Sequence, residues 1–306
     1  IPSFNCESFK KNLAKFKSKS LQPLIEIGFE NSNLLSMNLP LGTSGGLALI
    51  KDFRARIKNY NEHRNFPGVK GVSYLSIHNR FGTVSIRHLA KIALESYSQG
   101  SITWLNELIW RDFYFQILSN FPHVQDGKTF KIKYNNLKFE NDEKKFKAWT
   151  NGETGFPIVD AGMRQLNSTG YMHNRLRMII ACFLVKDLLI DWRWGEKYFA
   201  DNLIDFDLSA NNGGWQWAAS TGCDAQPYFR VFNPTLQSER FDSDGMFIKK
   251  YVPELNLLNK KEIHQPSLFF DKSPTTFPIK LGVDYPYPIV NHSEQKLKAI
   301  ALFKNI

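Results

Sequence analysis

The chain has 306 residues, which is enough for one large domain or two modest domains with a substantial hydrophobic core. Hydrophobic residues make up 42% of it, so the composition is that of a globular chain and excludes an intrinsically disordered one. Lys and Arg number 39 against 29 Asp and Glu, a formal net charge of +10. This charge fits a polyanionic partner, and it fits a generically basic cytosolic protein equally well.

The three cysteines, Cys6, Cys182 and Cys223, are too widely spaced for a disulfide framework or a zinc site. We interpret Cys182 and Cys223 as core residues and the compartment as reducing. The seven histidines show no metal-ligand spacing, so no metal is predicted. No apolar run reaches the roughly 18 residues that a membrane span needs, and the first residues carry no signal-peptide pattern. These features predict a cytoplasmic protein with no membrane partner.

Residues 1–42 lack a sustained period, whereas apolar residues recur at helical three- and four-residue steps from Ser44 onward. The first helical set is Leu47, Ile50, Phe53, Ile57 and Tyr60. Further helices are predicted over 84–97, from a cap at Ser101 or Thr103 to Pro122, from Pro157 to Gly170, and over 173–190. Residues 123–145 read as a loop. No segment alternates like a strand, so the predicted fold class is mainly α.

The helix after Ser101 has two distinct faces. Its predicted core stripe is Leu105, Leu108 and Ile109. Four other residues share a second face at helical spacing: Glu107, Trp110, Arg111 and Tyr114. An indole beside a carboxylate suits recognition of a base, although composition alone favours an ordinary amphipathic helix with a half-buried Trp.

The predicted helix from His173 carries Arg175 and Arg177 in an otherwise apolar run. Its face opposite the buried stripe carries Asn174, Arg177, Met178 and Ala181. Buried charges need partners. The candidate partners are Asp187, Asp191, Asp205 and Asp207. A structural ion-pair network and a ligand site both remain open at this point.

The stretch from Asn211 to Arg230 is the most distinctive in the chain. Trp215 and Trp217 follow two asparagines and two glycines, and paired glycines let a backbone approach a bulky flat group. This stretch and residues 171–178 resemble the flavin-binding core of DNA photolyases, and the likeness extends from about Thr43 to about Pro288. The resemblance implies a helical FAD-binding domain of the photolyase/cryptochrome type over residues 43–306. Residues 1–42 would be an interdomain linker remnant, with the antenna domain absent.

The closest resemblance is to class I cyclobutane pyrimidine dimer photolyases. It implies a deoxyribodipyrimidine photo-lyase that repairs dimers in DNA by light-driven electron transfer from reduced FAD. The implied partner is DNA containing pyrimidine dimers, met by a monomer that is cytoplasmic and associates with the nucleoid when bound to DNA. No antenna chromophore would be held by this chain.

The resemblance also implies roles for individual residues. Cofactor contacts fall on Tyr60, Ser73, Leu75, Ser76, Arg177, Asp205, Asp207 and Asn211. Substrate contacts fall on Arg64, Glu107, Trp110, Asn174, Arg175, Met178, Trp217 and Arg230. Catalytic roles fall on Glu107, Asn174, Met178, Asn211, Trp215 and Trp192. An amide at Asn211 favours reduced flavin by hydrogen bonding without protonating it, whereas Asn212 can also be read as a helix cap.

Two positions depart from the family pattern. The family's flavin diphosphate motif corresponds to residues 72–76, where Ser73 and Ser76 keep their hydroxyls and Val72 replaces one. Phosphate contact is therefore expected to weaken somewhat. Phe139 stands where the outermost Trp of the family's electron-transfer chain falls, beyond Trp215 and Trp192. Phenylalanine is far harder to oxidise than indole, so we expect poor photoreduction but unaffected repair. Trp149 is the candidate substitute outlet if it lies near the surface.

Two alternatives stay open. One is a cryptochrome-type blue-light photoreceptor, against which Asn211 and the slot of Glu107, Trp110, Met178 and Trp217 argue. The other is a flavin-free DNA-binding or structural remnant, which bound flavin would exclude.

Overall fold

The computed structural model describes residues 23–28, 37 and 39–304, and the chain divides into two units, Ile1–Asn38 and Leu39–Ile306. Within the first unit the described element is a short 3-10 helix, η2 (Leu24–Ile27). Most of the linker predicted over residues 1–42, Cys6 included, lies outside the described residues, so that assignment stays a prediction.

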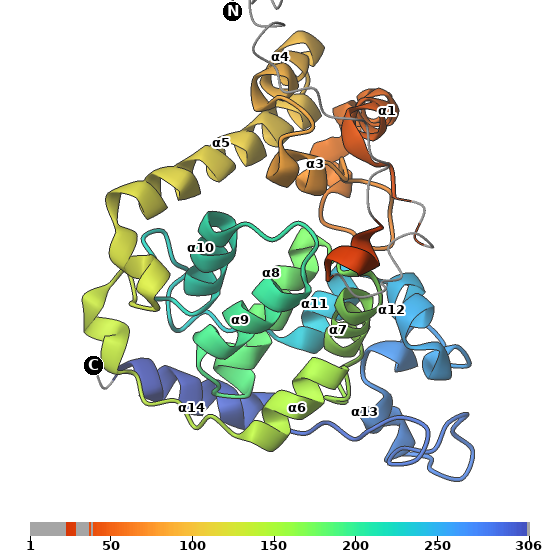
Figure 1. Cartoon of the computed structure of the whole chain (residues 1–306). Coiled ribbons are helices and arrows are strands. Elements are labelled where there is room, and N and C mark those ends of the chain that lie inside the picture. Colours follow the sequence, from red (N-terminus) through yellow and green to blue (C-terminus); the bar gives the residue numbers. More distant parts are fainter. Residues whose placement is uncertain (1–22, 29–36, 38, 305–306) are drawn as a thin grey trace, which may run out of the picture. The chain divides into compact units, whose positions relative to one another are not determined.

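The second unit is mainly helical (Figure 1). Its α-helices are α1 (Gly42–Arg54), α2 (Tyr60–His63), α3 (Ser76–Phe81), α4 (Ile86–Ser96), α5 (Gln99–Asn120), α6 (Glu143–Asn151), α7 (Pro157–Thr169), α8 (Asn174–Cys182), α9 (Trp192–Asn202), α10 (Leu208–Ala218), α11 (Pro234–Phe241), α12 (Met246–Tyr251), α13 (Pro266–Phe270) and α14 (His292–Lys304). Between them lie 3-10 helices η4 (Ile57–Asn59), η5 (Pro122–Asp126), η6 (Ile132–Asn136), η8 (Pro253–Leu255) and η9 (Glu262–His264), and the π-helix η7 (Phe183–Asp187). An isolated bridge between Leu281 and Tyr285 is the sole β-type pairing in the described part of the chain. The mainly-α prediction is confirmed.

The unit is built around two hydrophobic clusters. The larger draws on the chain from η6 to α14 and encloses Trp149, Trp192 and Phe199. The smaller is formed by α1, α2, α4 and the first half of α5, around Phe53 and Trp104. Helix α5 begins in the smaller cluster and continues alongside α10 (Figure 1), so it connects the two clusters.

Helix α5 begins earlier than predicted. Ser98 is its N-cap, and the side chains of Ser98 and Ser101 exchange hydrogen bonds with each other's backbone N–H in a capping box. Gly100 permits this start, because a Cβ there would lie 2.2 Å from the carbonyl oxygen of Ile57. The predicted cap at Ser101 or Thr103 is therefore wrong, although Ser101 takes part in the cap.

Two residues assigned to buried stripes are exposed. Ile109 is 56% exposed, because Trp104 and Leu108, one turn apart, define the line along which α5 packs. Leu47 is 52% exposed at the outer side of α1, whereas Ile50 and Phe53 are buried as expected. Both errors have the same cause. A helical period shows which side of a helix is apolar, but it does not show how wide the buried part of that side is.

The helix predicted over residues 173–190 is interrupted. Helix α8 ends at Cys182 and the chain continues as the π-helix η7. Leu189 then adopts a left-handed conformation, with φ 54°. Residues 179–190 are all buried, so tertiary packing overrides the local helical period here.

Candidate functional site

A cavity of about 530 Å³ lies between α5, α8 and α10, in the size range typical of ligand pockets. Twelve of the predicted site residues line it: Arg64, Ser76, Glu107, Trp110, Asn174, Arg177, Met178, Asp205, Asp207, Asn211, Trp215 and Trp217. Residues more than 150 positions apart in the sequence therefore meet in one place.

Helix α8 contributes one wall of the cavity. The four residues predicted to share a face, Asn174, Arg177, Met178 and Ala181, all line it. His173 starts this helix by accepting a hydrogen bond from the Arg175 N–H at its Nδ1. Burial, together with the nearby arginines, lowers the pKa of His173 to about 4, so the ring that holds the start of α8 is neutral at physiological pH.

Arg177 is held rigidly at this wall. Its Nη2 lies 2.8 Å and 3.0 Å from the two carboxylate oxygens of Asp205, and its Nε donates to the Met172 carbonyl at 2.9 Å. The Asp205 side chain is 3% exposed, so an unpaired charge would be costly there. Of the four candidate carboxylate partners, Asp205 is the one that pairs with Arg177.

The other predicted partners have different roles. Asp187 contacts His292 at 2.5 Å, and Asp191 pairs with Arg193. Arg175 donates to the Asn65 side chain at 2.6 Å, and its guanidinium lies over the Phe241 ring. Neither Arg175 nor Arg177 pairs with Asp187 or Asp191, because partner choice depends on contacts between distant segments.

Helix α10 forms the opposite wall. Asp207 is its N-cap and accepts a hydrogen bond from the Ala210 N–H at 3.2 Å. Asn211 donates one hydrogen bond from Nδ2 to the Glu196 carbonyl at 3.0 Å, which fixes the orientation of its amide. Asn212 lies inside the helix and not at its cap, since α10 already begins at Leu208.

The paired glycines of α10 have separate functions. A Cβ on Gly213 would lie 2.2 Å from the Tyr114 ring, so Gly213 is needed for α5 and α10 to pack closely. A Cβ on Gly214 would meet nothing within 4 Å, and Gly214 lines the cavity. The open space beside a flat group is therefore at Gly214.

Helix α5 supplies the third wall. Trp110 is 41% exposed, and its ring lies 6.0 Å from that of Tyr114. The carboxylate of Glu107 pairs with Arg64 at 2.6 Å. Trp217 reaches the same cavity from α10, so the face of α5 that composition left ambiguous opens onto the site.

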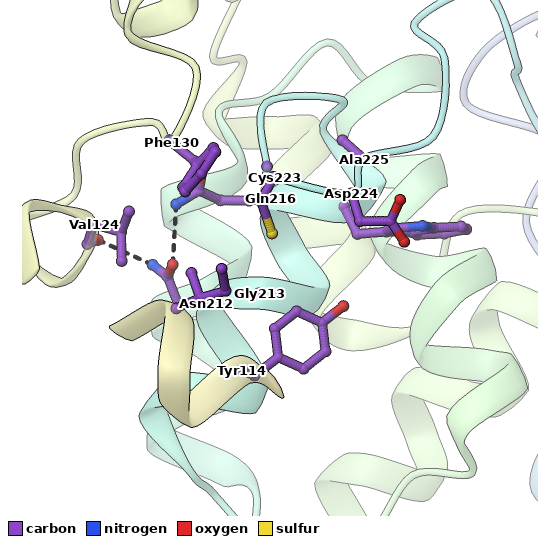
Figure 2. Close-up of a pocket in the computed structure, with 12 residues that line it drawn as sticks. Tyr114, Val124, Phe130, Asn212, Gly213, Gln216, Cys223, Asp224 and Ala225 are labelled. Atoms are coloured by element: carbon purple, nitrogen blue, oxygen red, sulfur yellow. Dashed lines mark hydrogen bonds between the residues drawn. The ribbon is translucent and has the colours of Figure 1, made fainter. Parts of the chain in front are cut away.

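A small pocket of about 20 Å³ lies next to the cavity, and hydrogen bonds beside it hold α10 in place (Figure 2). Asn212 donates to the Val124 carbonyl at 3.1 Å and accepts from Gln216 at 3.0 Å, as the dashed lines show. Gln216 in turn accepts from the Phe130 N–H at 2.8 Å. The pocket has room for about one water molecule, so we interpret it as a brace between α10 and the chain after α5. Cys223, predicted to be a core residue, is half-buried at its edge.

Several cavity residues have no counterpart in the sequence prediction. Asn79 and Arg80 come from α3, directly after the predicted phosphate motif, and Asp224 follows the tryptophan motif. The Oδ1 atom of Asn79 is buried without a hydrogen-bond partner, as expected for an atom that meets a ligand group. Proximity to the two motifs was the available signal for these residues. Four further lining residues without a predicted role are apolar: Phe199, Leu203, Phe206 and Ala210.

Six predicted site residues do not line the cavity: Tyr60, Ser73, Leu75, Arg175, Trp192 and Arg230. Tyr60, Leu75 and Trp192 are buried in the hydrophobic clusters, and Arg230 is exposed at the surface. Their assigned roles stay predictions. Trp149, the candidate outlet to solvent, is fully buried, so the condition that it lies near the surface is not met.

The family described as FAD binding domain of DNA photolyase matches residues 104–305, more than half of the chain. The chain belongs to this family. The photolyase-domain match begins inside α5 and includes the walls formed by α8 and α10. Helices α1 to α4 lie outside this match.

Several deoxyribodipyrimidine photo-lyases align with most of the chain. A deoxyribodipyrimidine photo-lyase from Vibrio cholerae is 48% identical over 263 residues, covering 84% of this chain and 54% of the relative. The one from Escherichia coli is 44% identical over 289 residues, covering 92% and 60%. The chain thus spans little more than half the length of these relatives.

Solved structures give the same picture. A class III photolyase from Agrobacterium tumefaciens superposes with a TM-score of 0.86 at 39% identity, covering 95% of this chain and 62% of that one. A cryptochrome from Synechocystis superposes with 0.79 at 34% identity, covering 85% and 56%. The photolyase/cryptochrome fold expected from the sequence is confirmed.

The described residues show neither a metal-binding cluster nor a membrane-spanning helix. No group of three or more His, Cys, Asp and Glu side chains there is arranged to hold a metal ion. Among the same residues, no helix is both long and apolar enough to cross a membrane.

Proposed function

We propose that this chain is the catalytic domain of a photolyase that repairs cyclobutane pyrimidine dimers in DNA. The proposal depends on one observation: two groups of residues line the same 530 Å³ cavity. Arg177, Asp205 and Asn211 are suited to a flavin, and Glu107, Trp110 and Trp217 are suited to a base. The proposed cofactor is FAD, which supplies a light-driven electron when it is bound in reduced form. The proposed partner is DNA that contains a pyrimidine dimer, met by a monomeric protein in the cytoplasm.

The residues present fit a flavin. The Arg177–Asp205 pair offers a fixed charge at the α8 wall, and Gly214 leaves open space for a flat ring. Asn211 can accept a hydrogen bond at Oδ1, and the bond from its Nδ2 to the Glu196 carbonyl fixes the orientation of the amide. An acceptor there favours a ring edge that carries N–H, which is the reduced state of a flavin. Asn79, Arg80 and Ser76 lie where the phosphate end would be held.

The slot fits a flipped-out dimer. Trp110 and Trp217 offer flat apolar surfaces from different helices, and Met178 and Asn174 line the space with them. The Arg64–Glu107 ion pair keeps the Glu107 carboxylate oriented, so that it can accept N–H groups from a pyrimidine edge. A dimer is poorly stacked in duplex DNA and is therefore cheaper to extrude than a normal base.

The roles of the chain are binding and orientation. Trp110 and Trp217 position the dimer, Glu107 and Asn174 hold its polar edges, and Asn211 biases the cofactor toward its reduced form. None of these side chains needs to transfer a proton in the proposed mechanism. Arg175 and Arg230 are proposed to contact DNA phosphates outside the cavity.

The test is the loss of dimers from irradiated DNA with chemically reduced protein, in light against darkness. Light-dependent loss supports the proposal. Bound FAD without any dimer loss would support the cryptochrome-type photoreceptor instead, a reading with the Synechocystis structure as a fold neighbour. A chain that neither retains FAD nor takes it up would support the flavin-free remnant.

A further inference from the structure

A continuous series of aromatic rings leads from the cavity to the protein surface. Trp215 lines the cavity and is 2% exposed. Its ring centroid lies 6.2 Å from that of Trp149, and the Trp149 centroid lies 5.7 Å from that of Tyr198. Tyr198 is half-buried, and its hydroxyl donates to the side chain of the exposed residue Asn167 at 2.8 Å. Three oxidisable side chains are thus in sequential contact.

The route expected from the family pattern is less well built in this chain. No ring contact joins Trp192 to Trp215 or to Phe139 among the described residues, and Phe139 is hard to oxidise. The Arg193 guanidinium lies 4.8 Å from the centre of the Trp192 ring. A positive charge there opposes formation of a tryptophan radical cation, although Asp191 pairs with Arg193 at 2.9 Å and offsets part of this effect.

The surroundings of Trp149 suit a relay. No cation lies over the rings of Trp215, Trp149 or Tyr198 in the part of the chain that the structure describes. The Trp149 Nε1 is buried without a hydrogen-bond partner, as is the Nε1 of Trp192, so an oxidised Trp149 has no hydrogen-bonded group to which it can lose a proton. It therefore stays a strong oxidant until an electron arrives from the adjacent Tyr198.

We propose that Trp149 and Tyr198 form the route by which electrons reach Trp215 from outside, in place of a route that ends at Phe139. The proposal rests on the proposed function, because the oxidant is a photo-excited oxidised flavin in the cavity. Trp215 gives one electron to that flavin, Trp149 replaces it, and Tyr198 replaces the electron of Trp149. Oxidised Tyr198 releases its phenolic proton to water at the surface. An external thiol then returns one hydrogen atom to Tyr198, so that overall the thiol loses one electron and one proton.

Tyr198 is well placed for this last step. Burial raises the pKa of its hydroxyl, partly offset by the hydrogen bond with Asn167, so the side chain enters the reaction as the neutral phenol. An amide such as Asn167 orients the hydroxyl but does not take up the proton. Water at the exposed Asn167 is therefore the proton acceptor.

The experiment is flash illumination of the FAD-loaded chain with an external thiol, read by electron paramagnetic resonance and by transient absorption. Tyrosine deuterated on its ring assigns the signal to a tyrosyl radical. We expect the parent to form this radical, and Tyr198→Phe and Trp149→Phe to lose it and to photoreduce flavin only at the background rate. Trp104→Phe is the matched control for loss of a buried indole, since Trp104 lies in the other hydrophobic cluster.

The outcomes separate this proposal from the proposed function. A parent without a tyrosyl radical, or photoreduction that survives Trp149→Phe but is lost in Trp192→Phe, overturns the route. Repair by chemically reduced protein is expected to persist in Tyr198→Phe, and this repair tests the function independently of the route. If Trp149→Phe fails to fold, the loss or survival of the radical in Tyr198→Phe still decides the question.

Discussion

At the scale of single residues, the Arg177–Asp205 pair is the fixed point of the proposed flavin wall. Removing Asp205 leaves the partly buried guanidinium of Arg177, 27% exposed, without its counter-charge. We predict that Asp205→Ala lowers the free energy of unfolding by about 3–5 kcal/mol and weakens FAD binding. Urea unfolding and flavin titration measure the two effects.

The matched control for this change is an exposed pair of the same kind. Lys197 and Asp201 pair at 3.0 Å with both side chains more than half exposed. Asp201→Ala is expected to change stability by less than about 1 kcal/mol and leave FAD binding unaltered. If Asp205→Ala behaves like this control, the pair has no role in holding the cofactor.

The two indoles of the slot are predicted to discriminate damaged DNA. Trp110→Ala or Trp217→Ala should each reduce binding of dimer-containing DNA by about 1–3 kcal/mol, the usual contribution of a base stacked on an aromatic ring. Binding of undamaged DNA should change little, because no base enters the slot. Titration of both DNAs with each variant makes the measurement, and equal losses on the two would show that these indoles are structural.

At the scale of the helices, the glycine pair of α10 separates packing from binding. We predict that Gly213→Ala costs about 1–3 kcal/mol of stability, because its Cβ would overlap the Tyr114 ring and push α5 from α10. Gly214→Ala has steric room and should leave stability unchanged or raise it by up to about 1 kcal/mol.

The same two variants should also differ in FAD affinity, and here the larger effect is expected from Gly214→Ala. The methyl group of Gly214→Ala intrudes on the cavity, so this variant is expected to bind FAD more weakly while folding normally. Thermal unfolding and flavin titration of both proteins test the pair. A Gly214→Ala protein with parental FAD affinity would show that the ring does not lie beside Gly214.

The start of α8 is predicted to respond to pH. The pKa of His173 is lowered by burial to about 4, from 6.5 in the unfolded chain, so the unfolded state binds the proton more tightly. The stability contributed by neutral His173 is therefore present above pH 6.5 and lost as pH falls through about 4. At about 1.4 kcal/mol per pKa unit, the loss amounts to a few kcal/mol.

His173→Asn isolates this effect. Asparagine is a good N-cap, so α8 should still start at the same place, but the titrating ring is gone. Between pH 4 and 6.5 the variant is expected to show a flatter dependence of stability on pH than the parent. Parallel dependences in the two proteins would mean that other groups control acid unfolding.

At the scale of the whole molecule, the net charge of +10 predicts the salt dependence of DNA binding. Contacts between basic side chains and phosphates release counterions, so affinity should fall steeply with salt for damaged and undamaged DNA alike. The difference between the two affinities should stay nearly constant, because it arises in the slot. Titrations over a range of salt concentrations check this, and a salt-independent affinity would mean that phosphate contacts are unimportant.

Local patterns were sufficient for much of the architecture. The sequence by itself determined the helical class, because a period of three to four residues reports directly which side of a helix is apolar. It also determined the face of α8 that carries Asn174, Arg177 and Met178, since positions three and four apart share a face whatever the helix packs against. The residues of the cavity were identifiable largely because two specific motifs resemble a known family.

Contacts between distant segments decided the rest. The pairing of Arg177 with Asp205, the separate roles of Gly213 and Gly214, and the end of α8 in a π-helix all depend on what packs against each residue. The sequence shows that Trp149 and Tyr198 are present, but it does not show that the Trp149 ring contacts the rings of both Trp215 and Tyr198. Spacing along a chain fixes only the neighbours within one helix, whereas partner choice, burial and ring contacts are set when the helices pack together.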